Sequence, residues 1–191
     1  MSKIRTEELE PSGAVLLLVD FVNPLRFVGA KQLTPSAVAA AEQTAALRRR
    51  LSPSGIRTIY ANDNYGLWAS DFRALWQSCA GMRGAPGQIA KRLRPNKKDF
   101  AVLKPRHSAF YATPLDLLLK QLRCKQLIVT GISADSCVLF SAMDAYLRGY
   151  SLWIPIDCVA AETRETRDKA LEHMERVLKA DVRPSVHPAK C

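Results

Sequence analysis

Short apolar runs alternate with segments of helical spacing along most of the chain. The apolar runs have the length of buried strands and occur at 14–19, 57–61, 100–103, 127–129 and 151–156. Helical spacing predicts helices over about 37–51, 68–79, 113–122, 135–147 and 163–179, and a short edge strand is expected at 182–185. This alternation predicts an α/β fold: a three-layer αβα, Rossmann-like structure with a doubly wound, mainly parallel sheet of five to six strands.

Boundary residues refine this picture. Thr34 or Ser36 is expected to cap the helix that ends near Leu51, because their hydroxyls can accept from unpaired backbone N–H groups. The Gly- and Pro-rich stretch 81–87 is expected to be a loop that serves as a lid or a subunit contact. Since repeats and convincing linkers are absent from the sequence, residues 1–191 are expected to form a single domain.

Composition and charge exclude several classes of protein. The sequence has no apolar run near the roughly 20 residues of a membrane span, and charges occupy the place of a signal peptide's apolar region, so a cytoplasmic protein is expected. The five cysteines include no CxxC pair, which argues against a disulfide framework or a structural zinc site. The net charge of +10 raises nucleic-acid binding as a hypothesis. The basic residues are spread along the sequence and are expected to lie on solvated faces of helices, so no specific nucleic-acid partner is expected.

Three reactive side chains fall at the end of predicted strands. Asp20 follows the first strand, Lys104 the third, and Cys137 opens the helix after the fourth. In a doubly wound sheet the ligand site lies outside the carboxyl ends of the strands. Cys137 would then lie in a first helical turn, where the helix dipole should lower the pKa of its thiol. Asp20 could take the thiol proton and return it to a leaving amine, while the Lys104 ammonium would stabilise the thiolate.

Each of these residues also has a purely structural interpretation. Asp20 could cap a turn, Lys104 could be solvated, and Cys137 could be one more small buried residue. His107 lies near Lys104 in the sequence, so a Cys137–His107 dyad is an alternative catalytic arrangement. The other histidines, His173 and His187, are expected at the surface.

Three ordered segments resemble the isochorismatase-like cysteine hydrolase family, which includes nicotinamidases and N-carbamoylsarcosine amidases. They are Leu16-Leu-Leu-Val-Asp-Phe21, Val102-Leu-Lys-Pro-Arg-His-Ser-Ala-Phe110 and Val129-Thr-Gly-Ile-Ser-Ala-Asp-Ser-Cys-Val138. The resemblance covers nearly the whole chain and implies that Asp20, Lys104 and Cys137 form a catalytic triad. It also implies a cis peptide between Ile132 and Ser133, an oxyanion hole made by the N–H groups of Ser133 and Cys137, and a homodimer or homotetramer.

The chain departs from the family pattern at two places. Ala134 stands where Thr is common, which should loosen support for the turn. Asp63-Asn-Tyr65 replaces the Asp-x-His metal motif of nicotinamidases, and the stretch from there to Lys104 contains no other His. No catalytic metal and no cofactor are therefore expected.

The resulting hypothesis is a metal-independent hydrolase that acts on a small amide, carbamoyl or ureido compound through an acyl-thioenzyme. Cys137 favours C–N hydrolysis over the vinyl-ether hydrolysis of true isochorismatases, which needs no cysteine. A non-catalytic binding or scaffold protein on the same fold is the alternative from another class. The side chains that could line the substrate pocket are Phe21, Leu25, Asn64, Tyr65, Trp68, Phe72, Phe110 and Tyr111.

Overall fold

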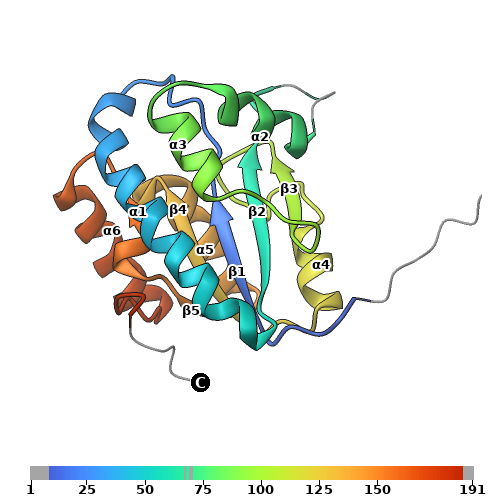
Figure 1. The fold of residues 1–191 in the computed structure, drawn as a ribbon. Helices are drawn as coiled ribbons and strands as arrows, with labels where there is room; N and C mark the ends of the chain where they lie inside the picture. The colour runs from blue at the N-terminus through green and yellow to red at the C-terminus, as the bar shows by residue number, and fades with distance from the viewer. Residues whose placement is uncertain (1–8, 67, 69–70, 187–191) are drawn as a thin grey trace, which may run out of the picture.

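The computed structural model describes residues 9–66, 68 and 71–186. Its centre is a six-stranded sheet in the order β3-β2-β1-β4-β5, with β6 also paired to β4, and every strand pair is parallel (Figure 1). The predicted α/β fold with a doubly wound parallel sheet is confirmed. The strands are β1 Ala14–Val19, β2 Arg57–Asp63, β3 Phe100–Lys104, β4 Gln126–Ile132, β5 Ser151–Trp153 and β6 Val159–Ala160.

Helices cover both faces of the sheet. In Figure 1, α1 and α3 cross in front of the strands while α5 lies behind them. The helices are α1 Ala30–Leu51, α2 Phe72–Gly81, α3 Ala85–Arg92, α4 Leu115–Gln121, α5 Leu139–Leu147 and α6 Arg164–Leu178. Short turns of other helix types are η1 Ser52–Ser54, η2 Ala134–Val138 and η3 Ile156–Cys158, of which η2 is a π-helical turn.

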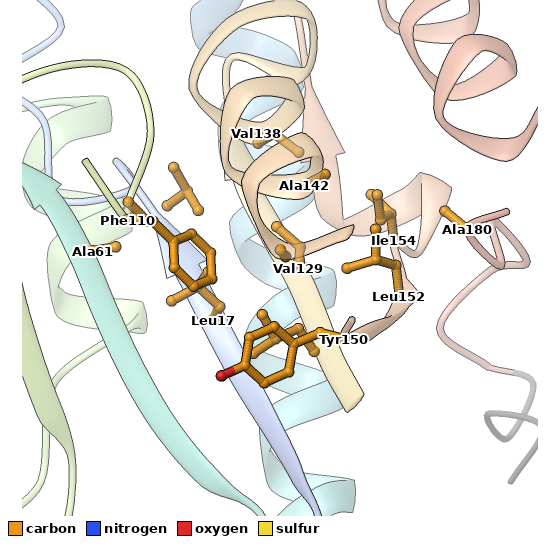
Figure 2. Packing of buried hydrophobic residues seen from close by; sticks show 14 of the residues in the cluster. Leu17, Ala61, Phe110, Val129, Val138, Ala142, Tyr150, Leu152, Ile154 and Ala180 are labelled. Atoms are coloured by element: carbon orange, nitrogen blue, oxygen red, sulfur yellow. The ribbon is translucent and has the colours of Figure 1, made fainter. Parts of the chain in front are cut away.

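Two hydrophobic cores, one on each side of the sheet, explain the continuous apolar run of β1. Leu16 and Leu18 pack into the core beneath α1, α2 and α3. Val15, Leu17 and Val19 point to the other face, where α4, α5 and α6 pack. Figure 2 shows this second core around β1, β4 and β5. Because alternate residues of a strand point to opposite faces, a strand buried on both sides must be apolar at every position.

The chain reverses its direction of travel across the sheet at β1. It moves outward through β2 and β3 and then crosses to β4 on the other side of β1. This reversal is the topological switch point, where open α/β sheets hold their ligands. Asp20 at the end of β1 and Cys137 after β4 therefore lie at this point.

Several predicted boundaries are wrong, and α2, for example, begins at Phe72 instead of Trp68. Helix α1 begins at Ala30, seven residues before the expected start at 37, after Gly29 with φ 89°. Thr34 and Ser36 are inside the helix, where their hydroxyls donate back to carbonyls of the preceding turn instead of capping. The expected loop 81–87 is mostly helical, because α2 ends at Gly81 and α3 begins at Ala85.

The end of the chain also differs from expectation. No edge strand forms within 182–185; instead Asp181 makes an isolated bridge to Trp153, and β5 ends there. The two-residue strand β6 was missed because so short a run carries no periodicity. Segment 1–8, His187 and Cys191 lie outside the described residues. In the part of the chain that is described, no helix is long and apolar enough to cross a membrane.

Gly131 is required by the close approach of β4 to β1. It pairs with Val19 in the sheet register, and its φ is 139°. A Cβ at this position would lie 2.1 Å from the Val19 carbonyl oxygen, which is far inside van der Waals contact. The strand end that leads to Cys137 can therefore be built only with glycine.

We predict that Gly131→Ala destabilises the fold by about 2 kcal/mol or more, because the methyl group clashes with backbone and the dihedral is strained. For a chain of this size this corresponds to a Tm decrease of at least about 4 °C in a thermal melt. Gly13→Ala is the matched control, since a Cβ at Gly13 meets nothing within 4 Å. Equal melting temperatures for the two variants would contradict this account.

Candidate active site

The structure brings Asp20, Lys104 and Cys137 together at the carboxyl edge of the sheet. The Lys104 ammonium lies 2.7 Å from Asp20 Oδ2 and 3.5 Å from Cys137 Sγ. Lys104 is fully buried and Asp20 is 4% exposed, whereas Cys137 is partly exposed. The acid and the ammonium therefore lie beneath the thiol, and solvent reaches the group through the sulfur.

Backbone groups from the end of β2 and from the loop after β3 hold the buried ion pair in place. Asp20 has φ 51°, and its Oδ1 accepts from the Asp63 N–H at 2.7 Å. The Lys104 ammonium also donates to the Arg106 carbonyl at 3.2 Å. These contacts satisfy both charged groups and fix their orientation toward Cys137.

The two charges control each other's protonation. Burial, the largest single effect, disfavours the charged Lys104, but Asp20, Cys137 and Asp63 together outweigh it and raise the pKa of the ammonium. Burial raises the pKa of Asp20, although Lys104 and the hydrogen bonds from Cys137 and Asp63 oppose it. A carboxylate with a raised pKa is a better proton acceptor than an ordinary aspartate.

The expected low pKa of the Cys137 thiol is wrong. Burial and the neighbouring Asp20 carboxylate raise the pKa of Cys137 to about 12, although the Lys104 ammonium lowers it. The free N–H groups of a first helical turn do not decide this balance, because the thiol is desolvated and faces an anion. The thiol is therefore protonated at neutral pH, and it donates a hydrogen bond to Asp20.

The turn that carries Cys137 follows β4 directly. The expected cis peptide between Ile132 and Ser133 is confirmed. The Ser133 carbonyl accepts from the N–H groups of Ser136 and Val138, each at 3.1 Å, which closes the π-helical turn η2 around Cys137. These bonds hold the turn even though Ala134 offers no hydroxyl. Ala134 is itself fully buried in the apolar core.

His107 lies on the exposed side of the thiol. Its Nδ1 is 3.7 Å from Cys137 Sγ and 3.4 Å from Ser136 Oγ. Its ring packs on Phe140, with the ring centroids 5.4 Å apart. The structure therefore brings together the two members of the alternative Cys137–His107 pair as well. His173 is exposed on α6, as expected.

The proposed pocket residues differ in whether their side chains are buried in the cores or exposed at the surface. Phe21 and Phe110 are buried in opposite cores, so these two side chains support the fold and do not line an open pocket. Phe72 packs on Tyr60 at the edge of the same core as Phe21, so it also supports the fold. Of the proposed pocket residues, the exposed aromatic side chains are Tyr65, Trp68 and Tyr111. Leu25 and Asn64 are half-buried and buried, respectively.

The Asp63–Tyr65 segment has a tyrosine where the nicotinamidase metal motif has a histidine, and its carboxylate is engaged in a turn. Asp63 Oδ1 accepts from the Tyr65 N–H at 2.6 Å, which occupies a carboxylate oxygen in the turn. Desolvation and the carboxylates of Asp20 and Asp63 raise the pKa of the Tyr65 phenol, which keeps it a neutral, weak ligand. Among the described residues, no three His, Cys, Asp or Glu side chains gather closely enough to hold a metal ion.

A separate cavity of about 720 Å³ lies near the amino ends of the strands. Arg48, Arg57 and Asp99 are among its lining residues, and Arg48 and Asp99 form an ion pair of 2.5 Å within it. None of the triad residues lines this cavity. Its basic lining is on the opposite edge of the sheet from Cys137.

Comparisons with known proteins identify the family. The model of the isochorismatase domain matches residues 14–182. An isochorismatase family protein of Bacillus subtilis (strain 168), YaaI, which is described as uncharacterised, is 38% identical over 174 residues, covering 91% of this chain and 95% of that protein. The chain therefore belongs to the isochorismatase family.

Solved structures agree with this assignment. N-carbamoylsarcosine amidase from Thermoplasma acidophilum is 25% identical and has a TM-score of 0.71, with 93% of this chain and 99% of that chain covered. The nicotinamidase of Staphylococcus aureus shares the fold, with a TM-score of 0.70 at 21% identity and coverage of 90% and 98%. The chain is an isochorismatase-family hydrolase.

The pKa of Cys137 should respond in opposite directions to its two charged neighbours. We predict that Asp20→Asn lowers the pKa of the thiol, because it removes the nearby anion, and that Lys104→Met raises it, because it removes the cation. The rate of iodoacetamide alkylation of the Cys137 peptide, followed against pH, measures both shifts. In the parent protein the rate should still be rising above pH 9, since the pKa is about 12. A parent profile that levels off below pH 8, or a shift of the same sign in both variants, would show that these charges do not control the thiol.

Proposed function

We propose that this protein is a cysteine-dependent hydrolase of a small amide, carbamoyl or related C–N substrate, and that it works through an acyl-thioenzyme. The observation that carries the proposal is the contact of one partly exposed thiol with a buried carboxylate and a buried ammonium. A nucleophile, a proton acceptor and a fixed positive charge are the groups that acyl transfer from nitrogen to sulfur requires.

In the first half-reaction, Sγ of Cys137 attacks the substrate carbonyl carbon while the thiol proton moves to Asp20. The N–H groups of Ser133 and Cys137 are the proposed oxyanion hole for the tetrahedral intermediate. As the C–N bond breaks, Asp20 returns the proton to the departing nitrogen, and ammonia or an amine leaves. Lys104 stays protonated throughout and stabilises the sulfur as its negative charge develops.

In the second half-reaction, water attacks the thioester carbonyl carbon, the C–S bond breaks, and the acid product leaves. The water loses one proton, and Cys137 regains one. A thiol with a raised pKa suits this cycle, because the sulfur gives up its proton only as the new bond forms and readily takes a proton back.

The named relatives support this substrate class. One is an N-carbamoylsarcosine amidase and another a nicotinamidase, so both are named for hydrolysis of an amide or carbamoyl group. Vinyl-ether hydrolysis, as in true isochorismatases, gives no role to a thiol that donates to the Asp20 carboxylate. A single domain, a homodimer or homotetramer and a cytoplasmic location remain predictions.

We predict that a panel of small primary amides, carbamoyl compounds and ureido acids contains a compound from which the protein releases ammonia. Cys137→Ala should reduce this release at least about 1,000-fold, because covalent catalysis is lost. Asp20→Asn should also reduce kcat strongly, although its thiol is easier to ionise. Thermal melts of each variant control for folding. Ammonia release that persists in Cys137→Ala contradicts the mechanism, and a parent protein inactive on the whole panel favours the non-catalytic alternative.

Ammonia release should not depend on a divalent metal. Because Tyr65 replaces the histidine of the nicotinamidase metal motif, dialysis against EDTA is expected to leave the rate within about 2-fold of the untreated rate. Back-addition of zinc, manganese and iron salts completes the assay. Loss of activity in EDTA followed by recovery with one of these metals would overturn this expectation.

A further inference from the structure

His107 differs from the buried members of the site in its access to solvent. Asp20 is 4% exposed and Lys104 is fully buried, whereas His107 is exposed. All three contact the same sulfur atom or its proton: the ammonium at 3.5 Å, the carboxylate through the thiol proton, and the imidazole at 3.7 Å. The thiol therefore has one ionisable neighbour on its solvent side and two beneath it.

The imidazole is held in position by two contacts from the helical segment that contains Cys137 and continues into α5. Phe140 packs against its ring, and Ser136 Oγ lies 3.4 Å from Nδ1. A hydroxyl that donates to Nδ1 favours the tautomer with its proton on Nε2. In this tautomer Nδ1 is a proton acceptor that faces both Ser136 and the sulfur.

The two half-reactions place different demands on the site. In the first, the proton to be moved is on sulfur, and Asp20 already accepts a hydrogen bond from it. In the second, the proton to be moved is on a water molecule that enters from solvent. With an acyl group on Cys137, the sulfur and the acyl group separate that water from the buried Asp20. A base for the water is better placed on the exposed side.

We propose that His107 is the general base of the second half-reaction, so that acylation relies on Asp20 and deacylation on His107. The inference rests on the proposed function. The incoming water displaces the Ser136 hydroxyl from the lone pair on Nδ1 of neutral His107, and Nδ1 takes a proton from this water as the water oxygen bonds to the thioester carbonyl carbon. The C–S bond then breaks with its electron pair on sulfur, and the imidazolium returns the proton to Cys137 across the short gap between Nδ1 and Sγ. The atoms and charges balance with no further reactant.

p-Nitrophenyl acetate separates the two half-reactions, because its leaving group needs no proton from the enzyme. Acetylation of Cys137 should release a burst of nitrophenolate close to one equivalent, and the steady rate that follows reports deacetylation. We predict that His107→Gln keeps the burst and slows the steady rate about 100-fold, which is typical for loss of a general base. Acetylated Cys137 should accumulate in this variant, as seen by peptide mass spectrometry. His173→Gln, an exposed histidine on α6, is the matched control and should behave like the parent protein.

Chemical rescue distinguishes a base from a merely structural residue. His107→Ala should deacetylate slowly, and added imidazole should restore the steady rate in proportion to its concentration, because the site is open to solvent. A His107→Gln steady rate within about 3-fold of the parent rate, without accumulated acetyl-enzyme, would overturn the inference. So would an equal loss of burst rate and steady rate, or a His107→Ala rate that does not respond to imidazole.

The same experiment distinguishes failure of this inference from failure of the proposed function. Cys137→Ala should show neither burst nor acetylation. A parent protein that is never acetylated on Cys137, or a burst that survives in Cys137→Ala, contradicts the thiol mechanism itself. Normal acetylation of Cys137 with unchanged deacetylation in His107→Gln contradicts only the role of His107.

Discussion

The buried ion pair between Lys104 and Asp20 is the constraint on which the site depends. Two charges removed from water are costly unless each compensates the other and all polar atoms find partners. Here Lys104 Nζ lies 2.7 Å from Asp20 Oδ2, and backbone groups of Asp63 and Arg106 supply the additional hydrogen bonds. Removing either partner would leave an isolated charge inside the protein. The pair therefore requires the ends of three strands to stay in register.

This register comes from the sheet. Lys104 is on β3 and Asp20 follows β1, so β2 lies between them. Asp63, the last residue of β2, pairs with Lys104 in the sheet and donates its N–H to Asp20. The long side chain of Lys104 spans the distance across β2 to the Asp20 carboxylate. Apolar burial on both faces of the sheet thus fixes the positions of polar groups at its edge, and Gly131 lets β4 bring Cys137 to the same place.

Much of this arrangement was predictable because it follows from local patterns. Apolar runs gave the five longer strands, and the rule for strand ends correctly placed Asp20, Lys104 and Cys137 on one edge. The pKa of Cys137 was not predictable, because it depends on desolvation and on a carboxylate over a hundred residues away in the sequence. The contact of His107 with Cys137 depends on how a loop after β3 folds, which periodicity does not encode. The extent of α1 was missed because Thr34 and Ser36 can bond within a helix as well as cap one.

The high pKa of Cys137 also affects how the protein withstands oxidants. Peroxides react with thiolates far faster than with thiols, and oxidation beyond the sulfenic acid is largely irreversible. Since Asp20 and burial keep the sulfur protonated, the resting site exposes little of the oxidisable species. Cys79, Cys124 and Cys158 are buried, and burial raises the pKa of each thiol as well. In the proposed mechanism the sulfur loses its proton only as it attacks a bound carbonyl group, so the resting thiol should react slowly with small oxidants that diffuse past it.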